Sequence, residues 1–483
     1  MTPFPSRNGF APSAGEELPQ YHQGMLEVKL RSHLGAFGAA MTSGGPAMLT
    51  RAAAATTPGL GTLMAYERSG LIRRVTPLAS VGVAEAWGET PMLMTFAAAS
   101  SPLAQADPNA NVVLVELHRD QDTRSLEGEL RRDPAVESVA RVPVRYLLKS
   151  KKVAPVLPAA AAPASSLWNL SRIRWAAARQ TPGFAEATAI KVAVLDTGLD
   201  RGHPDGPANV AHYEFDHPTD ATASSARDLI GHGTHVSGTI AARINNAVGV
   251  NGICDCTLSV FKIFDDIPDW YPQQGYFAYF VDPVMYQRAL SRCLTLGVDV
   301  INLSIGGPGA PSPNESLLFS KLIQAGTTVV AAMGNDASSL PSYPAAIPDV
   351  LAVGACSIDD TVANFSNSGG HISLVAPGVG IWSTLPTYAG NTGYSPLATF
   401  PPQPDFSRPM ARDTNYASWD GTSMASPHVA AAVALLRAKR GAMSPAAVRL
   451  AVQAAAVKVA AMGGQNFTPN YGYGRLDLVE LLK

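Results

Sequence analysis

The sequence predicts an α/β fold with a central, mainly parallel sheet covered by helices on both faces, preceded by a small α+β domain. From residue 168 onward, apolar runs typical of buried strands alternate with segments of helical periodicity. Alternation of this kind calls for parallel strands joined by helices that pack on the sheet. The 483 residues are 46% hydrophobic and 15% charged, which is enough apolar material for a sizeable core in two or three domains.

Composition separates the first part of the chain into three segments. Residues 1–20 are rich in Pro, Gly and Ser without any period, which predicts a disordered lead. Residues 21–148 contain strand patterns at 24–31 and 111–118 with helical patterns beside them, which predicts the small α+β domain. Residues 149–167 combine a basic cluster with Pro and Ala, which indicates an exposed, protease-accessible linker.

Residues 168–483 contain the α/β alternation. Near its end, Ser444 and Pro445 predict the start of a helix, with the serine as N-cap and the proline in the first helical position. The other expected strands lie at 191–196, 258–264, 298–305, 327–334 and 349–356, and the other expected helices at 235–244, 287–297 and 316–326.

Charge and cysteine content exclude several classes of protein. The chain has 36 Lys plus Arg against 38 Asp plus Glu, so its net charge of -2 argues against a nucleic-acid or anionic-membrane partner. No charge-free apolar stretch is long enough to serve as a transmembrane segment. The four cysteines are sparse and irregularly spaced, which predicts free thiols and neither a disulfide framework nor a zinc site.

The N-terminus leaves the compartment open. It has no basic segment followed by an apolar core, so no secretory signal peptide is readable. Taken literally this favours a cytoplasmic protein, whereas a trimmed N-terminus or non-classical export would make it a secreted one.

Three reactive side chains stand beside glycines at a strand end or a helix start, where the backbone allows close approach of a substrate. Asp196 ends a predicted strand, and His232 and Ser423 stand at the starts of predicted helices. Taken alone, each has a structural interpretation: Asp196 as a turn former, His232 as a structural histidine and Ser423 as a helix cap. Together they supply the nucleophile, the base and the orienting carboxylate of serine catalysis.

The segments VLDTGLDRGHPD, GHGTHVSGTIAA and GTSMASPHVA resemble the three signature blocks of the subtilisin-like serine proteases, in the family's order Asp, His, Ser. The resemblance covers about residues 168–483 and implies a subtilisin-like three-layer domain that hydrolyses peptide bonds through an acyl-enzyme. It makes Ser423 the nucleophile, His232 the general base, Asp196 the orienting carboxylate and Asn335 the oxyanion-hole donor. No cofactor is required for this chemistry.

The resemblance extends to substrate binding. The segment LSIGG is similar to the family's strand that pairs with the substrate backbone, and AAMG is similar to the other wall of the main side-chain pocket. Ser342 aligns near the floor of that pocket. The remaining residues that the resemblance implies are Ser304, Ile305, Gly306, Gly307, Ala332, Met333 and Gly334.

Two long insertions depart from the shortest family members, at 265–283 and 387–418. The aromatic side chains of the first either form a hydrophobic subsite or cover the surface. Because long loops are usually functional or disordered, either insertion could narrow substrate choice or bind a partner.

The segment RINNAVGVNG resembles the family's calcium-binding loop. It would supply side-chain oxygens from Asn246, together with Asp205, which suits a hard cation. The loop is one residue longer than the usual form, so an empty turn is the alternative to a structural calcium ion. A second acidic group, around residues 265–269, is either another site or an exposed loop. The backbone carbonyls assigned to the first site are those of Ile244, Val248 and Val250.

The N-terminal domain resembles the ferredoxin-like propeptide of this family. The resemblance implies that its C-terminal tail, around VPVRYLLK, fills the cleft as an intramolecular inhibitor until the chain is cut between about Leu148 and Trp168. The expected partners are therefore protein or peptide substrates and the chain's own N-terminal domain. Two alternatives remain: a peptide ligase or macrocyclase on the same fold, and a non-catalytic interaction protein with a permanently blocked cleft.

Overall fold

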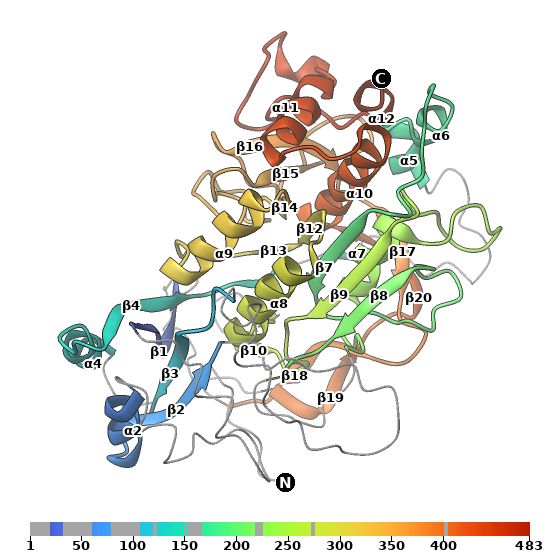
Figure 1. Cartoon of the computed structure of the whole chain (residues 1–483). Helices are drawn as coiled ribbons and strands as arrows, with labels where there is room; N and C mark the ends of the chain where they lie inside the picture. Colours follow the sequence, from blue (N-terminus) through green and yellow to red (C-terminus); the bar gives the residue numbers. More distant parts are fainter. Residues whose placement is uncertain are drawn as a thin grey trace, which may run out of the picture.

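The computed structural model describes residues 20–31, 60–78, 107–118, 123–148, 151–152, 167–217, 226–271, 276–399 and 404–483. All of the expected disordered lead except residue 20, and most of the expected linker, lie outside these ranges, so both stay predictions. Within the described residues, the chain forms a large α/β part and a smaller N-terminal sheet at one end of it (Figure 1).

The α/β part is built on a seven-stranded sheet in the order β16-β15-β14-β12-β7-β9-β8, and the registers of all neighbouring pairs are parallel. Except in the edge strand β8, the apolar residues of these strands are buried, as expected for strands covered on both faces. The strands are β7 (Lys191–Asp196), β8 (Val210–Glu214), β9 (Thr257–Lys262), β12 (Val300–Leu303), β14 (Thr328–Ala332), β15 (Leu351–Cys356) and β16 (Ile372–Pro377).

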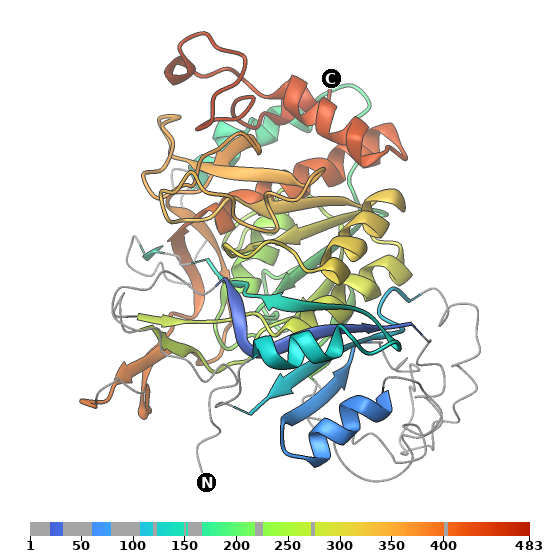
Figure 2. The same cartoon turned by 90° about the vertical axis from the view of Figure 1, so that its left-hand side faces the viewer.

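Helices cover both faces of this sheet, as Figure 2 shows from the side. On β7, Val192 and Val194 pack in one core cluster with α7 (His232–Ala241) and α10 (Thr422–Arg440). The alternate residues of β7 pack in a second cluster with α8 (Pro283–Leu296) and α9 (Pro313–Gln324). Because successive side chains of a strand point to opposite faces, this division places the sheet between two helical layers. The predicted three-layer fold is confirmed.

Several helices begin at a polar cap followed by proline. Asp282 accepts hydrogen bonds from the backbone of α8, and Ser312 does the same for α9. The predicted cap at Ser444 is confirmed, because its side chain accepts from the Ala447 amide at the start of α11 (Pro445–Ala455). The other short helices are α5 (Trp168–Arg172), α6 (Trp175–Ala178) and α12 (Leu478–Leu481).

Both insertions contain antiparallel hairpins that the sequence did not predict. The first forms β10 (Asp269–Tyr271) and β11 (Tyr276–Ala278), and the second forms β18 (Asn391–Pro396) and β19 (Pro404–Ala411). The second insertion continues into β20 (Asn415–Asp420), which pairs with β17 (Ile381–Leu385) on one side and with β6 (Lys151–Lys152) on the other. This insertion is therefore part of the folded body around the serine segment.

The N-terminal part is a four-stranded antiparallel sheet in the order β2-β3-β1-β4 with two helices, an α+β unit as predicted. One face buries apolar side chains against α2 and α4. The other face packs Met25, Leu114 and Val142 against Val284 of α8. The elements are β1 (Tyr21–Leu30), α2 (Leu60–Arg68), β2 (Ile72–Pro77), β3 (Val112–Leu117), α4 (Thr123–Leu130) and β4 (Val136–Pro143).

A buried carboxylate joins the N-terminal sheet to the start of α9. Glu27 of β1 accepts hydrogen bonds from the Ser312 hydroxyl (2.6 Å) and the Asn314 backbone amide (3.1 Å). Burial raises the pKa of Glu27, and the hydrogen bonds oppose that rise. A negative side chain here complements the positive end of the helix dipole.

The cysteine and membrane predictions can be compared with the described residues. All four cysteines lie among them, and all are buried free thiols, as predicted. None of the described helices combines the length and apolar character that crossing a bilayer demands.

His22 of β1 predicts that acid weakens the folded N-terminal sheet. Burial, together with the nearby charge of Arg145, lowers the pKa of His22 from 6.5 to about 4. The unfolded chain therefore binds a proton near pH 6.5 that the folded chain binds only at much lower pH. Stability should fall as pH drops through this window, by about 2 kcal/mol between pH 7 and pH 5.

The comparison uses the uncut Ser423→Ala chain with and without His22→Gln. The free energy of unfolding would be measured in urea at both pH values, from hydrogen exchange of the β3 amides. The His22→Gln chain should lose less stability on acidification. An equal loss in the two proteins would contradict the assignment to His22.

Candidate active site

Asp196 and His232 form a buried hydrogen-bonded pair. Asp196 is the last residue of β7 and His232 the first of α7, and their Oδ1 and Nδ1 atoms lie 2.7 Å apart. The same carboxylate oxygen accepts the Thr197 backbone amide at 2.7 Å. This arrangement leaves Nε2 of the imidazole, which has no hydrogen-bond partner among the described residues, as the nitrogen available for proton transfer.

Asp228 fixes the start of the histidine helix. Its N-cap, Gly231, has no side chain to cap the first amides, and Asp228 supplies the missing acceptor. One carboxylate oxygen accepts the Gly231 amide (2.7 Å) and the Thr197 hydroxyl (2.8 Å), while the other accepts the amide and hydroxyl of Thr234. Sequence reasoning missed Asp228, for which the only signal was an acid upstream of a helix that begins at glycine.

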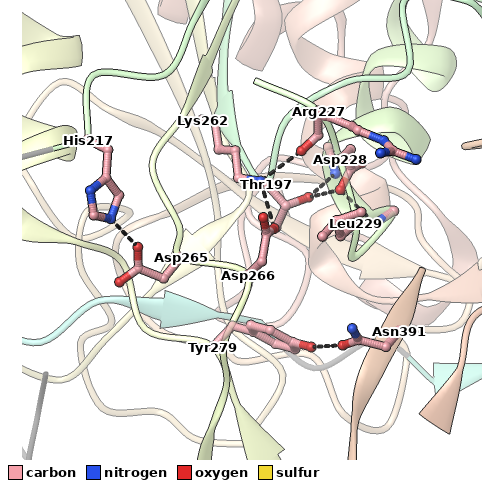
Figure 3. A network of polar contacts seen from close by, with 12 residues as sticks. Thr197, His217, Arg227, Asp228, Leu229, Lys262, Asp265, Asp266, Tyr279 and Asn391 are labelled. Atoms are coloured by element: carbon pink, nitrogen blue, oxygen red, sulfur yellow. Dashed lines mark hydrogen bonds and ion pairs between the residues drawn. The ribbon is translucent and has the colours of Figure 1, made fainter. Parts of the chain in front are cut away.

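Figure 3 shows that ion pairs surround this network. The Lys262 ammonium at the end of β9 donates to the Arg227 carbonyl (2.7 Å) and pairs with Asp266 (2.6 Å). Asp265 pairs with His217 at 2.8 Å. Asp266 is therefore paired with a lysine and Asp265 is bonded to a histidine ring, and the side chain of the third acid of this segment, Asp269, lies outside the described positions.

Ser423 lies in the first turn of α10 and is fully buried. Its hydroxyl donates to the Ser304 carbonyl at 3.2 Å, so the structure does not contain a Ser423–His232 hydrogen bond. The Ser304 hydroxyl in turn donates to the Ser423 carbonyl at 3.0 Å. Trp419 of β20, just before the serine turn, stacks near the His232 ring with centroids 6.3 Å apart. The serine turn and the histidine are thus neighbours.

Asn335 is tied to the residue beside the serine. Its Oδ1 accepts the backbone amide (2.9 Å) and the hydroxyl (2.7 Å) of Thr422. The N-cap of α10 is Gly421, so Asn335 satisfies an amide that the helix cannot cap by itself. Both helices therefore begin at a glycine and are capped by a side chain outside the helix, from distant Asn335 for α10 and from nearby Asp228 for α7.

Asn367 shapes the loop that carries Asn335, and sequence reasoning missed it. Its amide group donates to the Met333 carbonyl (3.1 Å) and accepts the amides of Asp336 (2.9 Å) and Ser338 (3.0 Å). Gly334 has φ +107°, and a Cβ there would lie 2.2 Å from Asn367 Nδ2. Only glycine fits this position.

The tail of the N-terminal sheet lies in the cleft as a strand. β5 (Tyr146–Leu147) pairs antiparallel with β13 (Ile305–Gly306). On its other edge, the Leu147 amide donates to the Tyr279 carbonyl (2.8 Å) and the Arg145 carbonyl accepts the Val281 amide (2.9 Å). The tail is therefore hydrogen-bonded on both sides, as in strand addition.

The register places Leu148 opposite Ser304, which contacts Ser423. Leu148 is 1% exposed and packs in a cluster with Ala332. A Cβ at Gly306 would lie 2.8 Å from the Leu148 side chain and 2.9 Å from Ser342 Oγ, so these residues bound one pocket.

Of the other residues expected along the cleft, some face the tail directly and others offer only their backbone. Gly307 faces the tail, since a Cβ there would lie 2.1 Å from the Val144 carbonyl oxygen. The side chains of Ile305 and Met333 pack in the core, so only their backbones are available to a substrate.

The two insertions meet beside the cleft. The Tyr279 hydroxyl donates to the Asn391 side chain at 3.1 Å (Figure 3). Arg412 of the second insertion donates to the Leu229 and Tyr388 carbonyls and so anchors it near the start of α7. The aromatic side chains of β10 lie outside the described positions, so their role as a hydrophobic subsite stays a prediction.

The calcium-like loop wraps a buried carboxylate. Asp205 accepts the Asn246 side-chain amide (2.7 Å) and the Val250 backbone amide (2.8 Å), and burial raises its pKa to about 6. No group of three or more His, Cys, Asp or Glu side chains that could hold a metal occurs in the described part of the chain. Both Asp205 oxygens accept N–H groups here, and the Asn246 Oδ1 accepts the Val248 amide (3.0 Å). Carboxylate, amide and backbone carbonyl oxygens are nevertheless the ligand types that a hard cation takes.

His235 and His428, which also lie in the signature blocks, have structural environments. His235 stacks on Trp419 with centroids 4.8 Å apart, and burial lowers its pKa to about 3. His428 bonds the Met424 carbonyl, and burial lowers its pKa to about 4. Both are therefore neutral packing residues at ordinary pH.

Comparison with known proteins identifies the family. The model of the subtilase family matches residues 187–474. Subtilisin amylosacchariticus from Bacillus subtilis subsp. amylosacchariticus is 32% identical over 355 residues, covering 72% of this chain and 76% of that protein. Subtilisin from Bacillus pumilus is 33% identical over 316 residues, covering 64% of this chain and 96% of that protein.

A solved structure supports the same fold. Fervidolysin from Fervidobacterium pennivorans, described as a keratinolytic enzyme related to subtilisin, superimposes with a TM-score of 0.63 at 23% identity. The match covers 96% of this chain and 62% of that one. With the motifs and the family match, the chain belongs to the subtilases and is a serine-type endopeptidase.

Proposed function

We propose that the chain is a self-processing zymogen whose first substrate is its own peptide bond between Leu148 and Lys149. The observation that carries this proposal is the strand pairing of residues 146–147 with β13, whose register sets Leu148 opposite Ser304, the residue whose carbonyl accepts the Ser423 hydroxyl. On the far side of the expected bond, β6 pairs with β20, the strand that leads into the serine turn. Described segments on both sides of the bond thus flank the nucleophile.

The proposed reaction begins with rotation of the Ser423 hydroxyl from the Ser304 carbonyl toward His232 Nε2. The serine oxygen attacks the Leu148 carbonyl carbon while Nε2 takes the hydroxyl proton. Asp196 holds the Nδ1–H of the imidazole and stabilises its positive charge. His232 then gives the proton to the Lys149 nitrogen as the C–N bond breaks, leaving an acyl ester on Ser423.

Water completes the cycle. A water molecule adds to the ester and gives a proton to His232, which returns it to the departing Ser423 oxygen. During both steps negative charge develops on the former carbonyl oxygen of Leu148. We assign its stabilisation to the Asn335 side-chain amide and the Ser423 backbone amide, with Thr422 holding Asn335 in place.

After the cut, the N-terminal part would act as an inhibitor. Three sets of contacts support this role: the tail on β13, the apolar face on α8 and Glu27 at the start of α9. None of them depends on the bond after Leu148, so they would persist until the N-terminal part is degraded or released.

We also propose a structural calcium ion at the loop around Asp205. Asp205 and Asn246 would supply side-chain oxygens, and Ile244, Val248 and Val250 would supply backbone carbonyls. The ion would stabilise the folded chain by neutralising a buried carboxylate, and the reaction needs no metal.

The first prediction of this proposal concerns self-cleavage. Purified wild-type protein should separate into residues 1–148 and 149–483, whereas Ser423→Ala should stay whole because it lacks the nucleophile. Ser444→Ala, which removes a distant helix cap of the same residue type, should still be cut. The measurement is intact mass over time.

Other masses would contradict the proposal. A wild-type chain that stays whole would favour the permanently blocked interaction protein, and joined or cyclic products would favour the ligase. Cleavage of Ser423→Ala at the same bond would show that another protease acts.

The second prediction concerns Asn335→Ala. Loss of the amide donor should reduce kcat on a peptide substrate by about 10²–10³, the reduction known for the corresponding asparagine of subtilisin, with KM little changed. Asn209→Ala, at an exposed hydrogen bond to Asp255, serves as the control and should keep wild-type kinetics. A decrease in kcat of less than a few fold in Asn335→Ala would contradict the assignment of Asn335 as the oxyanion-hole donor.

The third prediction concerns calcium. In the uncut Ser423→Ala background, calcium should raise the melting temperature by several degrees relative to a chelator, because binding to the folded state alone stabilises it. Adding Asp205→Asn should abolish most of this increment, whereas Asp349→Asn, at a surface ion pair with Arg449, should retain it. Equal calcium increments in all three proteins would contradict a site at Asp205.

A further inference from the structure

The tail in the cleft carries a buried ion pair that links it to α9. Arg145 Nε and Nη2 donate to the two carboxylate oxygens of Glu315, at 3.2 and 2.9 Å. Both side chains are 2% exposed. A two-pronged arginine–carboxylate contact of this kind fixes geometry as well as charge.

Neighbouring groups complete the site around this pair. Arg145 Nη1 donates to the Gly309 carbonyl at 2.8 Å, and the Tyr286 hydroxyl donates to Glu315 at 3.2 Å. Val281 and Pro283 line a small cavity beside the pair, together with Val142 and Pro143 of β4. The groups that contact the arginine, Glu315 and the Gly309 carbonyl, lie on the α/β part and remain when the tail departs.

Strand pairing fixes which residue of a peptide enters this pocket. Leu148 lies opposite Ser304 and is the residue before the proposed cut, so Arg145 is the fourth residue before it. The Val281 amide bonds the Arg145 carbonyl and the Tyr279 carbonyl bonds the Leu147 amide. Because these are backbone contacts, any peptide that binds as the same strand presents its fourth residue to Glu315.

We propose that Glu315 makes the cleft selective for substrates with arginine at the fourth residue before the cut bond. This inference rests on the proposed function of the cleft. An apolar side chain at that position would bury Glu315 without a positive partner, which is strongly unfavourable. Lysine would supply a positive charge. Its single ammonium group could not, however, donate to both Glu315 oxygens and to the Gly309 carbonyl, as the planar guanidinium of arginine does.

The test uses processed wild-type enzyme and peptides Val-Xaa-Tyr-Leu-Leu joined to a fluorogenic amide. With arginine at Xaa, kcat/KM should exceed that of the leucine peptide by about 30-fold or more, with lysine between them. Citrulline, which keeps the shape of arginine and removes the charge, should fall close to leucine. Equal rates for arginine and citrulline would overturn the proposal.

Enzyme variants test the assignment to Glu315. Glu315→Gln should lower the arginine-to-leucine ratio at least tenfold, whereas Glu214→Gln, at a surface pair with Arg292, should keep the wild-type ratio. An unchanged ratio in Glu315→Gln would overturn the role of this residue. Because Glu315→Gln could fail to mature, the citrulline comparison on the wild-type enzyme decides the question independently.

The outcomes also separate this inference from the function on which it rests. Equal cleavage of the arginine and leucine peptides would overturn the selectivity and leave the protease function standing. Cleavage of neither peptide, with no labelling of Ser423 by a fluorophosphonate, would overturn the proposed function and the selectivity with it.

Discussion

The pairing of the N-terminal tail with β13 is the interaction on which the rest of the assembly depends. It gives residues 144–148 an extended conformation, bonded on both edges, and sets the register that brings Leu148 to Ser304. The same register buries Arg145 against Glu315. Backbone pairing does not depend on side-chain identity. The cleft can therefore distinguish one substrate sequence from another only at side-chain pockets such as those at Leu148 and Arg145.

The contact between the two parts of the chain combines apolar and polar elements that depend on one another. Val284 packs against the N-terminal sheet, and Glu27 and Arg145 find their partners on or next to α9. Removing either charged residue would leave unsatisfied polar groups at the start of α9 or in the cleft. The sheet and the tail are therefore expected to dock together, with the tail held in the cleft by surface far from Ser423.

The sequence predicted the fold class, and its resemblance to the family's signature blocks brought forward Asp196, His232, Ser423 and Asn335. The first three also stand beside glycines at strand or helix ends. Asn367 was missed because its role arises from packing against a loop about 30 residues away. Asp228 is close in sequence to the helix start that it caps, but the glycine at the cap position hid that role. The Arg145–Glu315 pair joins residues 170 positions apart, so no local sequence pattern links the two. The hairpins in the insertions were missed because β10 and β11 span only three residues each, and because β18 and β19 contain prolines and lack clear alternation.

The central claim is that the tail occupies the cleft until it is removed, and one time course tests it most directly. Freshly purified wild-type protein would be exposed to a fluorophosphonate, and intact mass would show which species carry the label. The label should appear only on chains that have lost residues 1–148, because the tail covers Ser423 in all others. Labelling of the full-length chain as fast as the trimmed chain would contradict the account.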